Sequence, residues 1–130
     1  MLEISNLEVA YGSIKALHGI SLKVPEKSIV TLIGGNGAGK STTLRTISGL
    51  VKARAGKIVY DGVDITNHPP HEIVGRQLCH VPEGRMVFAN LTVLENLKMG
   101  AYRRNDRKGI ADDIEYGFSV FPRLKERISQ

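Results

Sequence analysis

Apolar and polar residues alternate along the beginning of the chain, over residues 2–9. A period of two is typical of a strand with one buried face, and its break at Ser5-Asn6 predicts an irregularity in that strand. Tyr11-Gly12 has the composition of a turn, and residues 14–24 continue as a second strand-like stretch. The chain therefore opens with two predicted strands joined by a short turn.

The next apolar run has a different pattern, because residues 29–33 are apolar at every position except Thr31. A strand that is nearly continuous in apolar residues is typical of a parallel sheet covered on both faces. After a glycine-rich loop, residues 40–48 have the pattern of a helix, and Gly49 stands where a left-handed residue often ends one. This order predicts a buried strand, a loop and a helix in succession.

The middle of the chain carries a hairpin signal, since Asp61-Gly62 separates two short apolar stretches. His68-Pro69-Pro70 breaks the chain and is expected to begin a short helix. Residues 78–81 again have the pattern of a buried strand, in which we interpret Cys79 as a small buried apolar side chain.

The last third of the chain is predicted to be helical. Thr92 and Glu95 have the spacing of a capping box, in which the hydroxyl and the carboxylate each bond a free backbone N–H at the start of a helix. A second helix is expected over residues 110–121, with an apolar stripe formed by Ile110, Ile114, Phe118 and Phe121.

The chain has 130 residues, of which 42% are hydrophobic and 24% charged, as in a soluble globular domain or part of one. A net charge of +5 raises the question of nucleic-acid binding. The basic residues of 103–108 are, however, interrupted and followed by aspartates, and the chain has no tryptophan. We therefore expect a solvated charged face and no nucleic-acid partner.

One motif carries specific chemistry, because residues 34–41 match the phosphate-binding pattern G-x-x-x-x-G-K-[ST] in full. Glycines let successive backbone N–H groups point at one anion, and the following helix adds the positive end of its dipole. Lys40 reaches the β- and γ-phosphates, and the Ser41 hydroxyl is small enough to bind Mg²⁺. The alternative is a glycine-rich turn that a Lys-Ser pair follows by chance. The predicted nucleotide-binding residues here are Gly34, Gly35, Asn36, Gly37, Ala38, Gly39, Lys40 and Ser41.

Several weaker motifs surround this loop in a fixed order and together are more specific than the loop alone. They are residues 7–12, 16–21, 47–50, 56–58, 61–65 and 91–97. With them the chain resembles, over its entire length, the ATP-binding subunit of an ABC transporter. Residues 81–88 and 121–127 are similar to the group that serves branched-chain amino-acid importers, and the urea-type importers look similar as well.

The resemblance implies an α/β fold of the P-loop NTPase type, with an ABC ATPase-like core and an N-terminal antiparallel β subdomain. Residues 1–83 would form the nucleotide-binding core with this β subdomain. Residues 84–130 would begin the α-helical subdomain and stop before the signature motif, so that the domain is incomplete.

The resemblance also assigns roles to three residues outside the loop motif. Tyr11 would stack on adenine, with an exposed turn tyrosine as the alternative. Thr42 would either touch the α-phosphate or pack within its helix. Glu83 stands where most of the family has a glutamine that senses Mg²⁺ and the attacking water. A carboxylate can bind Mg²⁺ directly but adds negative charge near the γ-phosphate, and a solvent-facing loop carboxylate is the other interpretation.

ATP and Mg²⁺ are the implied cofactors. The implied partners are transmembrane permease subunits and a second ATP-binding subunit, in a homo- or heterodimer, at the cytoplasmic face of the membrane. Residues 84–100 resemble the docking surface for the permease, and Met86, Val87 and Phe88 would suit docking if exposed or the local core if buried.

The resemblance covers about the first half of a family domain, so we expect an N-terminal part of a longer protein. Neither the signature motif nor an apolar strand ending in Asp-Glu follows. Hydrolysis needs a positioned water and charge neutralisation, so these residues are expected to bind nucleotide without the ATPase activity that the full-length family couples to transport. A regulatory nucleotide-binding module is the alternative. A kinase is a further one, and a GTPase is disfavoured because no Asn-Lys-x-Asp motif occurs.

Overall fold

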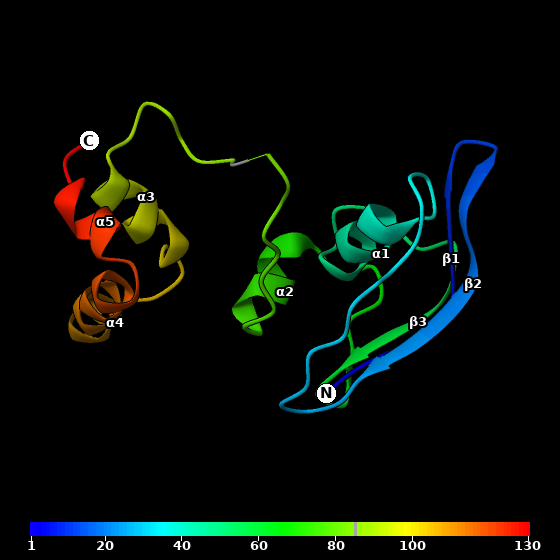
Figure 1. Ribbon diagram of the computed structural model, residues 1–130. Helices are drawn as coiled ribbons and strands as arrows, with labels where there is room; N and C mark the ends of the chain where they lie inside the picture. Colours follow the sequence, from blue (N-terminus) through cyan, green and yellow to red (C-terminus); the bar gives the residue numbers. More distant parts are fainter. Residues whose placement is uncertain (85) are drawn as a thin grey trace. The chain divides into compact units, whose positions relative to one another are not determined.

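The computed structural model describes residues 1–84 and 86–130, and Arg85, inside the 81–88 segment, lies outside the described residues. The chain divides into two compact units, Met1–Val81 and Pro82–Gln130, which are described separately below (Figure 1).

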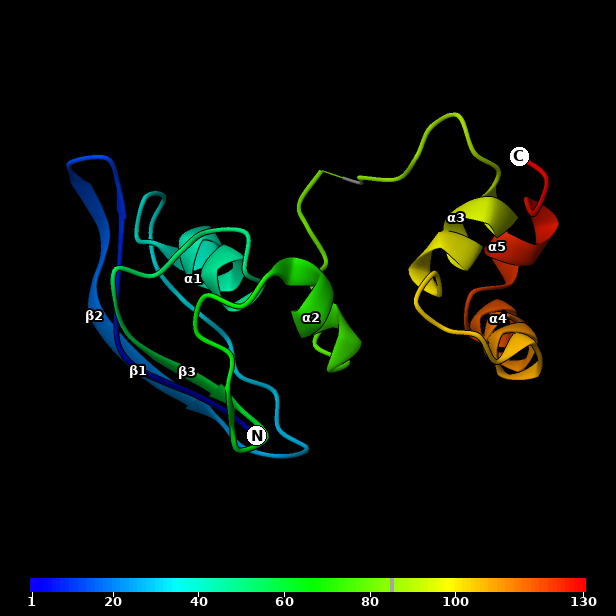
Figure 2. The same ribbon diagram turned by 180° about the vertical axis from the view of Figure 1, so that it is seen from behind.

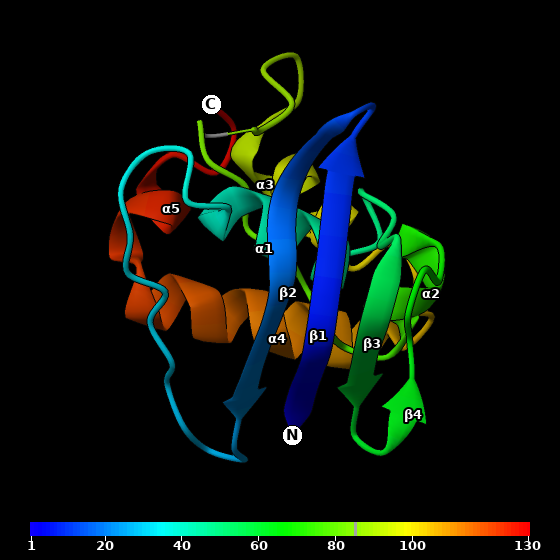
Figure 3. The same cartoon turned by 90° about the vertical axis from the view of Figure 1, so that its right-hand side faces the viewer.

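An antiparallel sheet forms the frame of the first unit. Its strands are β1 (Leu2–Tyr11), β2 (Ile14–Val24), β3 (Ala55–Tyr60) and β4 (Val63–Asp64). They lie side by side in the order β2-β1-β3-β4 (Figure 3). The pairing of β1 shifts register between Ile4 and Leu7, and Asn6 has a φ of 48°. The predicted irregularity at Ser5-Asn6 is therefore confirmed, as are the first two strands.

The hairpin predicted at Asp61-Gly62 is also confirmed, because β3 pairs with β4 across these two residues. Both have positive φ, 46° and 79°, as a two-residue turn between twisted strands requires.

Two helices accompany this sheet, α1 (Lys40–Ile47) and α2 (Pro70–Gly75). The first lies on one face of the sheet (Figure 2) and contributes Ile47 to a core that contains side chains from β1, β2 and β3. Gly49 follows α1 with a φ of 74°, and the Leu50 N–H donates to the Arg45 carbonyl at 2.9 Å. The helix thus ends as predicted, in a left-handed residue that satisfies a free carbonyl. The buried core residues are Ile4, Leu7, Val9, Leu17, Ile47, Ile58 and Ile65.

The two strands predicted over residues 29–33 and 78–81 are wrong, because neither segment pairs with another strand. Ile29 is 97% and Val81 91% exposed, and Cys79, expected to be buried, is exposed too. A strand exists only through hydrogen bonds to a neighbour, and the described residues supply none for these segments. The apolar side chains of these two segments suit a buried strand, but they would be buried only if the segments paired within a sheet.

Three helices form the second unit: α3 (Val93–Gly100), α4 (Arg107–Val120) and α5 (Pro122–Glu126). The predicted capping box is confirmed, since the Glu95 N–H donates to Thr92 Oγ1 at 3.2 Å and the Thr92 N–H to Glu95 Oε2 at 2.8 Å. On α4 the predicted apolar stripe is correct only in part. Phe118 is buried, whereas Phe121 lies beyond the last helical residue and is 61% exposed.

Gly56 is a position where only glycine fits. Its φ is 91°, and a methyl group at its Cα would overlap the carbonyl of Asn6 and lie 2.6 Å from Leu7 Cα. We expect Gly56→Ala to lower the free energy of unfolding by about 3 kcal/mol, since overpacking adds to the left-handed strain. The control Gly62→Ala has a φ of 79° but open space, and should cost only about 1–2 kcal/mol. Equal losses in denaturant unfolding would contradict this reading.

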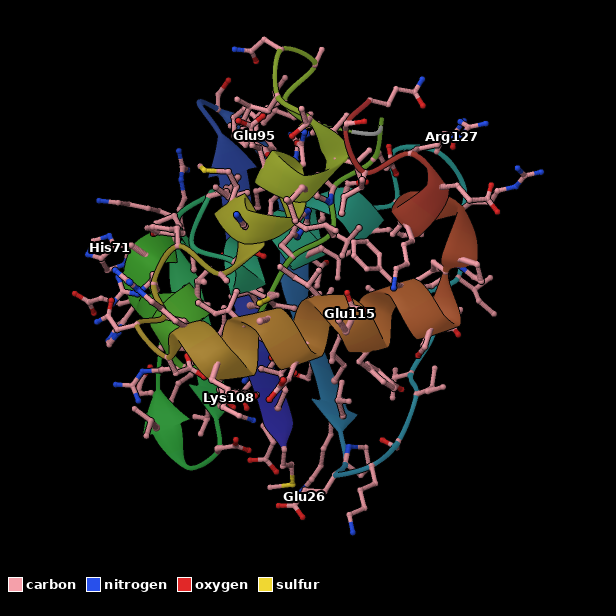
Figure 4. The ribbon with its side chains drawn as sticks, turned by 90° about the vertical axis from the view of Figure 1, so that its left-hand side faces the viewer. Glu26, His71, Glu95, Lys108, Glu115 and Arg127 are labelled. Atoms are coloured by element: carbon pink, nitrogen blue, oxygen red, sulfur yellow. The ribbon has the colours of Figure 1, made fainter. Side chains whose placement is uncertain are left out.

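The capping box predicts a pH dependence. The Thr92 N–H, and then the Thr92 hydroxyl, lower the pKa of Glu95 because both donate to its carboxylate. A carboxyl with a lowered folded pKa stabilises above its unfolded pKa, and this contribution is lost as the pH falls through the folded value. Helicity measured by circular dichroism should therefore fall on acidification, and less steeply in Glu95→Gln. Glu115 lies on α4 (Figure 4) and its carboxylate pairs with the Lys125 ammonium at 3.0 Å, outside any helix cap, so Glu115→Gln is the matched control. An identical acid profile for all three chains would overturn this expectation.

Candidate nucleotide-binding site

The phosphate loop, residues 34–41, connects the 29–33 segment to α1 and is curled rather than extended. The Ala38 N–H donates to the Gly35 carbonyl at 3.2 Å, which closes a turn. Gly37 and Gly39 have φ values of 84° and 88°, in the left-handed region that disfavours side chains. The glycines therefore do what the motif needs: they let the backbone fold back on itself immediately before a helix.

Gly39 fixes the start of α1 against the sheet. It is the residue that caps the helix, and it is buried. A methyl group on Gly39 would lie 2.5 Å from Leu17 Cδ2 and 3.0 Å from the Ala16 carbonyl, both on β2. The loop and the helix thus approach β2 as closely as a glycine allows.

The Lys40 ammonium bonds the backbone of its own loop. Its Nζ donates to the carbonyl of Gly34 at 2.6 Å and to that of Gly35 at 2.8 Å. An ammonium has three donor hydrogens, so these bonds leave one for another acceptor. A phosphate that enters the loop would compete with the two carbonyls for the same cation.

The first turn of α1 adds further donors. Helix geometry leaves the first backbone N–H groups without acceptors inside the helix, and the dipole makes this end positive. Ser41 is exposed, so its hydroxyl is accessible to a ligand or an ion. Thr42 is half-buried and its carbonyl accepts the Thr46 hydroxyl at 2.8 Å, which leaves both interpretations of its side chain open.

Tyr11, at the end of β1, is 48% exposed. It precedes the turn to β2, and an Arg54 guanidinium donates to the Gly12 carbonyl of that turn. The tyrosine therefore belongs to the same unit as the phosphate loop and presents part of its ring to solvent. Its proposed contact with a base stays a prediction.

Glu83 is exposed and belongs to the second unit, Pro82–Gln130. Its proposed role at Mg²⁺ also stays a prediction. Over the described ranges 1–84 and 86–130 no group of three or more His, Cys, Asp or Glu side chains is placed to hold a metal ion. The exposed Ser41 hydroxyl is one oxygen at the phosphate loop that could bind a cation beside phosphate oxygens.

An apolar cavity of about 790 Å³ lies in the second unit. Met86 is 73%, Val87 68% and Phe88 53% exposed, so this segment is not part of a local core. Asn96 holds it: its Oδ1 accepts the Phe88 N–H at 2.9 Å, and its Nδ2 donates to the Phe88 carbonyl at 3.0 Å. No motif predicts this role of Asn96, which stands directly after the capping box in the sequence. The cavity is lined mainly by Met86, Val87, Phe88, Leu91, Leu97 and Leu124.

None of the helices in the described part of the chain has the length and apolarity that a membrane span requires.

Comparisons with known proteins identify the protein family to which the chain belongs. The ABC transporter family model matches residues 17–129, and the chain belongs to this family. It is 44% identical over 130 residues to the high-affinity branched-chain amino acid transport ATP-binding protein BraG of Pseudomonas aeruginosa, covering 100% of this chain and 55% of that protein. It is 36% identical over 125 residues to the probable branched-chain amino acid transport ATP-binding protein LivF of Archaeoglobus fulgidus, covering 96% of this chain and 52% of that one.

A solved structure of an ATP-binding subunit of an ABC transporter superposes with a TM-score of 0.79 at 31% identity. The match covers 100% of this chain and 53% of that structure. The predicted ABC ATPase-like fold class is confirmed, and the chain spans about half the length of the curated relatives it matches.

Proposed function

We propose that this chain is the nucleotide-binding part of an ABC importer subunit and that its phosphate loop binds the polyphosphate of ATP. The observation that carries the proposal is the curled loop 34–41. It joins a lysine ammonium, two left-handed glycines and a helix N-terminus at one place. These are the groups that recognise a phosphate chain.

Mg²⁺ is the proposed companion of the nucleotide. Ser41 is exposed at the first turn of α1 and supplies a neutral hydroxyl oxygen of the kind that Mg²⁺ accepts beside phosphate oxygens. Glu83 is the second proposed ligand, by resemblance, and Tyr11 the proposed platform for adenine. The exposed part of the Tyr11 ring supports a stacking role.

Branched-chain amino acids are the proposed cargo of the transporter. Two relatives that match nearly the whole of this chain are described as branched-chain amino acid transport ATP-binding proteins. In this proposal the cargo is selected by other subunits of the transporter.

Transmembrane permease subunits and a second ATP-binding subunit are the proposed partners, which would place the chain at the cytoplasmic face of a membrane. The exposed apolar segment of Met86, Val87 and Phe88 supports a protein-docking role, because contiguous exposed apolar surface marks interaction sites.

Lys40 provides the direct test of nucleotide binding. Isothermal titration of the wild-type chain should show ATP binding, and Lys40→Ala should weaken it at least tenfold, about 1.4 kcal/mol. The matched control is Lys52→Ala, which removes an exposed lysine of the same unit outside the loop. Equal affinity for ATP in the wild-type chain and Lys40→Ala would contradict the proposal.

Binding and hydrolysis should separate in this chain. The sequence holds neither the signature motif nor a strand ending in Asp-Glu, so the groups that position and activate water are not among these residues. We expect no phosphate release above the uncatalysed rate from chain saturated with MgATP. Steady turnover that disappears in Lys40→Ala would show that these residues hydrolyse ATP after all.

A further inference from the structure

The β1–β2 hairpin carries Tyr11 beyond the part of the sheet that supports it. In the part of the chain that the structure describes, the pairing between β1 and β3 ends at Glu8 and Ala55. From there β1 continues to Tyr11 with β2 on one side, and the hairpin extends past the end of β3 (Figure 3). Because a two-stranded hairpin has little stability of its own in water, the position of its turn depends on further contacts.

Arg54 supplies such a contact from outside the hairpin. Its guanidinium donates to the Gly12 carbonyl, forty-two positions away in the sequence. Gly12 directly follows Tyr11 in the turn and has a φ of 59°, in the left-handed region. The guanidinium therefore bonds the backbone immediately beside the tyrosine that is the proposed platform for adenine.

The backbone of Arg54 is held in place by two other segments. Its N–H donates to the Glu8 carbonyl of β1 at 2.8 Å. The preceding residue, Ala53, is bonded twice by the side chain of Asn67: the Ala53 N–H donates to Asn67 Oδ1 at 2.7 Å, and Asn67 Nδ2 donates to the Ala53 carbonyl at 3.1 Å. The guanidinium thus extends to the turn from a fixed position in the sheet.

The same hairpin borders the phosphate loop. Leu17 of β2, which pairs with Val9 of β1, is the side chain that a methyl group on Gly39 would overlap. Tyr11 pairs with Ile14, farther towards the turn, and three residues of strand span about 10 Å. One hairpin therefore sets the separation between the tyrosine and the loop that would hold the phosphates.

We propose that Arg54 is a positioning residue for recognition of the nucleobase: by bonding the Gly12 carbonyl it fixes the turn that presents Tyr11, and so it adds to the affinity for the adenine part of ATP. The inference rests on the proposed function, because it requires a nucleotide in the phosphate loop with its base at Tyr11. Without the bond the turn samples more conformations, and a ligand that binds must then order it, which lowers affinity. Arg54 and Gly12 are both exposed, so water competes for the bond and its effect is limited to that of one hydrogen bond.

Titration of the chain with two ligands separates this role from simple attraction of a cation to phosphate. The ligands are MgATP and magnesium tripolyphosphate, which has the phosphate chain without the base. Arg54→Ala should weaken MgATP binding about fivefold, the effect of one hydrogen bond. It should leave tripolyphosphate binding within about twofold of the wild-type value, since an exposed charge contributes little. Arg54→Met, which keeps an apolar stem and removes the donors, should behave in the same way.

Two further measurements test positioning itself. Tyr11→Ala should also weaken MgATP binding, and adding Arg54→Ala to it should have no further effect, because the turn then presents no ring. In the chain without ligand, ¹⁵N order parameters of Gly12 and Ser13 should fall from about 0.85, typical of rigid backbone, towards about 0.6 in Arg54→Ala.

The matched control is Arg76→Ala, which removes the same charge from the exposed end of α2 in the same unit and should change neither affinity nor the order parameters. Equal losses for the two ligands in Arg54→Ala, additive losses in the double variant, or unchanged order parameters would each overturn the inference. MgATP binding that is undiminished in Arg54→Ala would overturn it as well and leave the proposed function standing. A wild-type chain that binds neither ligand would instead remove the proposed function, which is a distinct result.

Discussion

The close approach of Gly39 to β2 is the constraint on which the site depends. With no side chain there, the start of α1 lies against Leu17 and the Ala16 carbonyl, and Ile47 at the end of the helix reaches the core of the sheet. The helix is therefore held at both ends. The loop before it must curl to meet a fixed helix start, and this curl brings the Lys40 ammonium onto the Gly34 and Gly35 carbonyls. The packing of Gly39 against β2 thus determines where the positively charged Lys40 lies.

Short sequence motifs predicted the features that interactions between neighbouring residues determine, namely turns and helix caps. Asp61-Gly62 turns because both residues accept positive φ, and Thr92 caps α3 because Glu95 is three residues away. The segments 29–33 and 78–81 show the limit of such reasoning. Their apolar pattern describes how they would be buried in a sheet, but pairing depends on residues far away in the sequence. The Asn96 bonds to Phe88 and the Arg54 bond to Gly12 were equally beyond prediction, since each depends on a loop path that no motif encodes.

The residues of the candidate site likewise fall into those that a local motif predicts and those that rest on the family resemblance. The spacing of the loop motif predicted which residues gather at the start of α1, and the structure shows how β2 supports them. Tyr11 and Glu83 rested on resemblance. The first is a half-exposed ring in the same unit as the loop, and the second an exposed carboxylate at the beginning of the other unit. In the second unit an apolar cavity lies beside the exposed side chains of Met86, Val87 and Phe88, which is the surface for which we propose a docking role.

The central claim is that the backbone of the phosphate loop, with Lys40, grips a polyphosphate chain. Amide ¹H–¹⁵N spectra recorded during a titration with MgATP test it most directly. The account predicts that the largest chemical-shift changes fall on the N–H groups of residues 35–42, because these donors gain an anionic acceptor. Changes concentrated elsewhere in the chain, or none at saturating nucleotide, would contradict it.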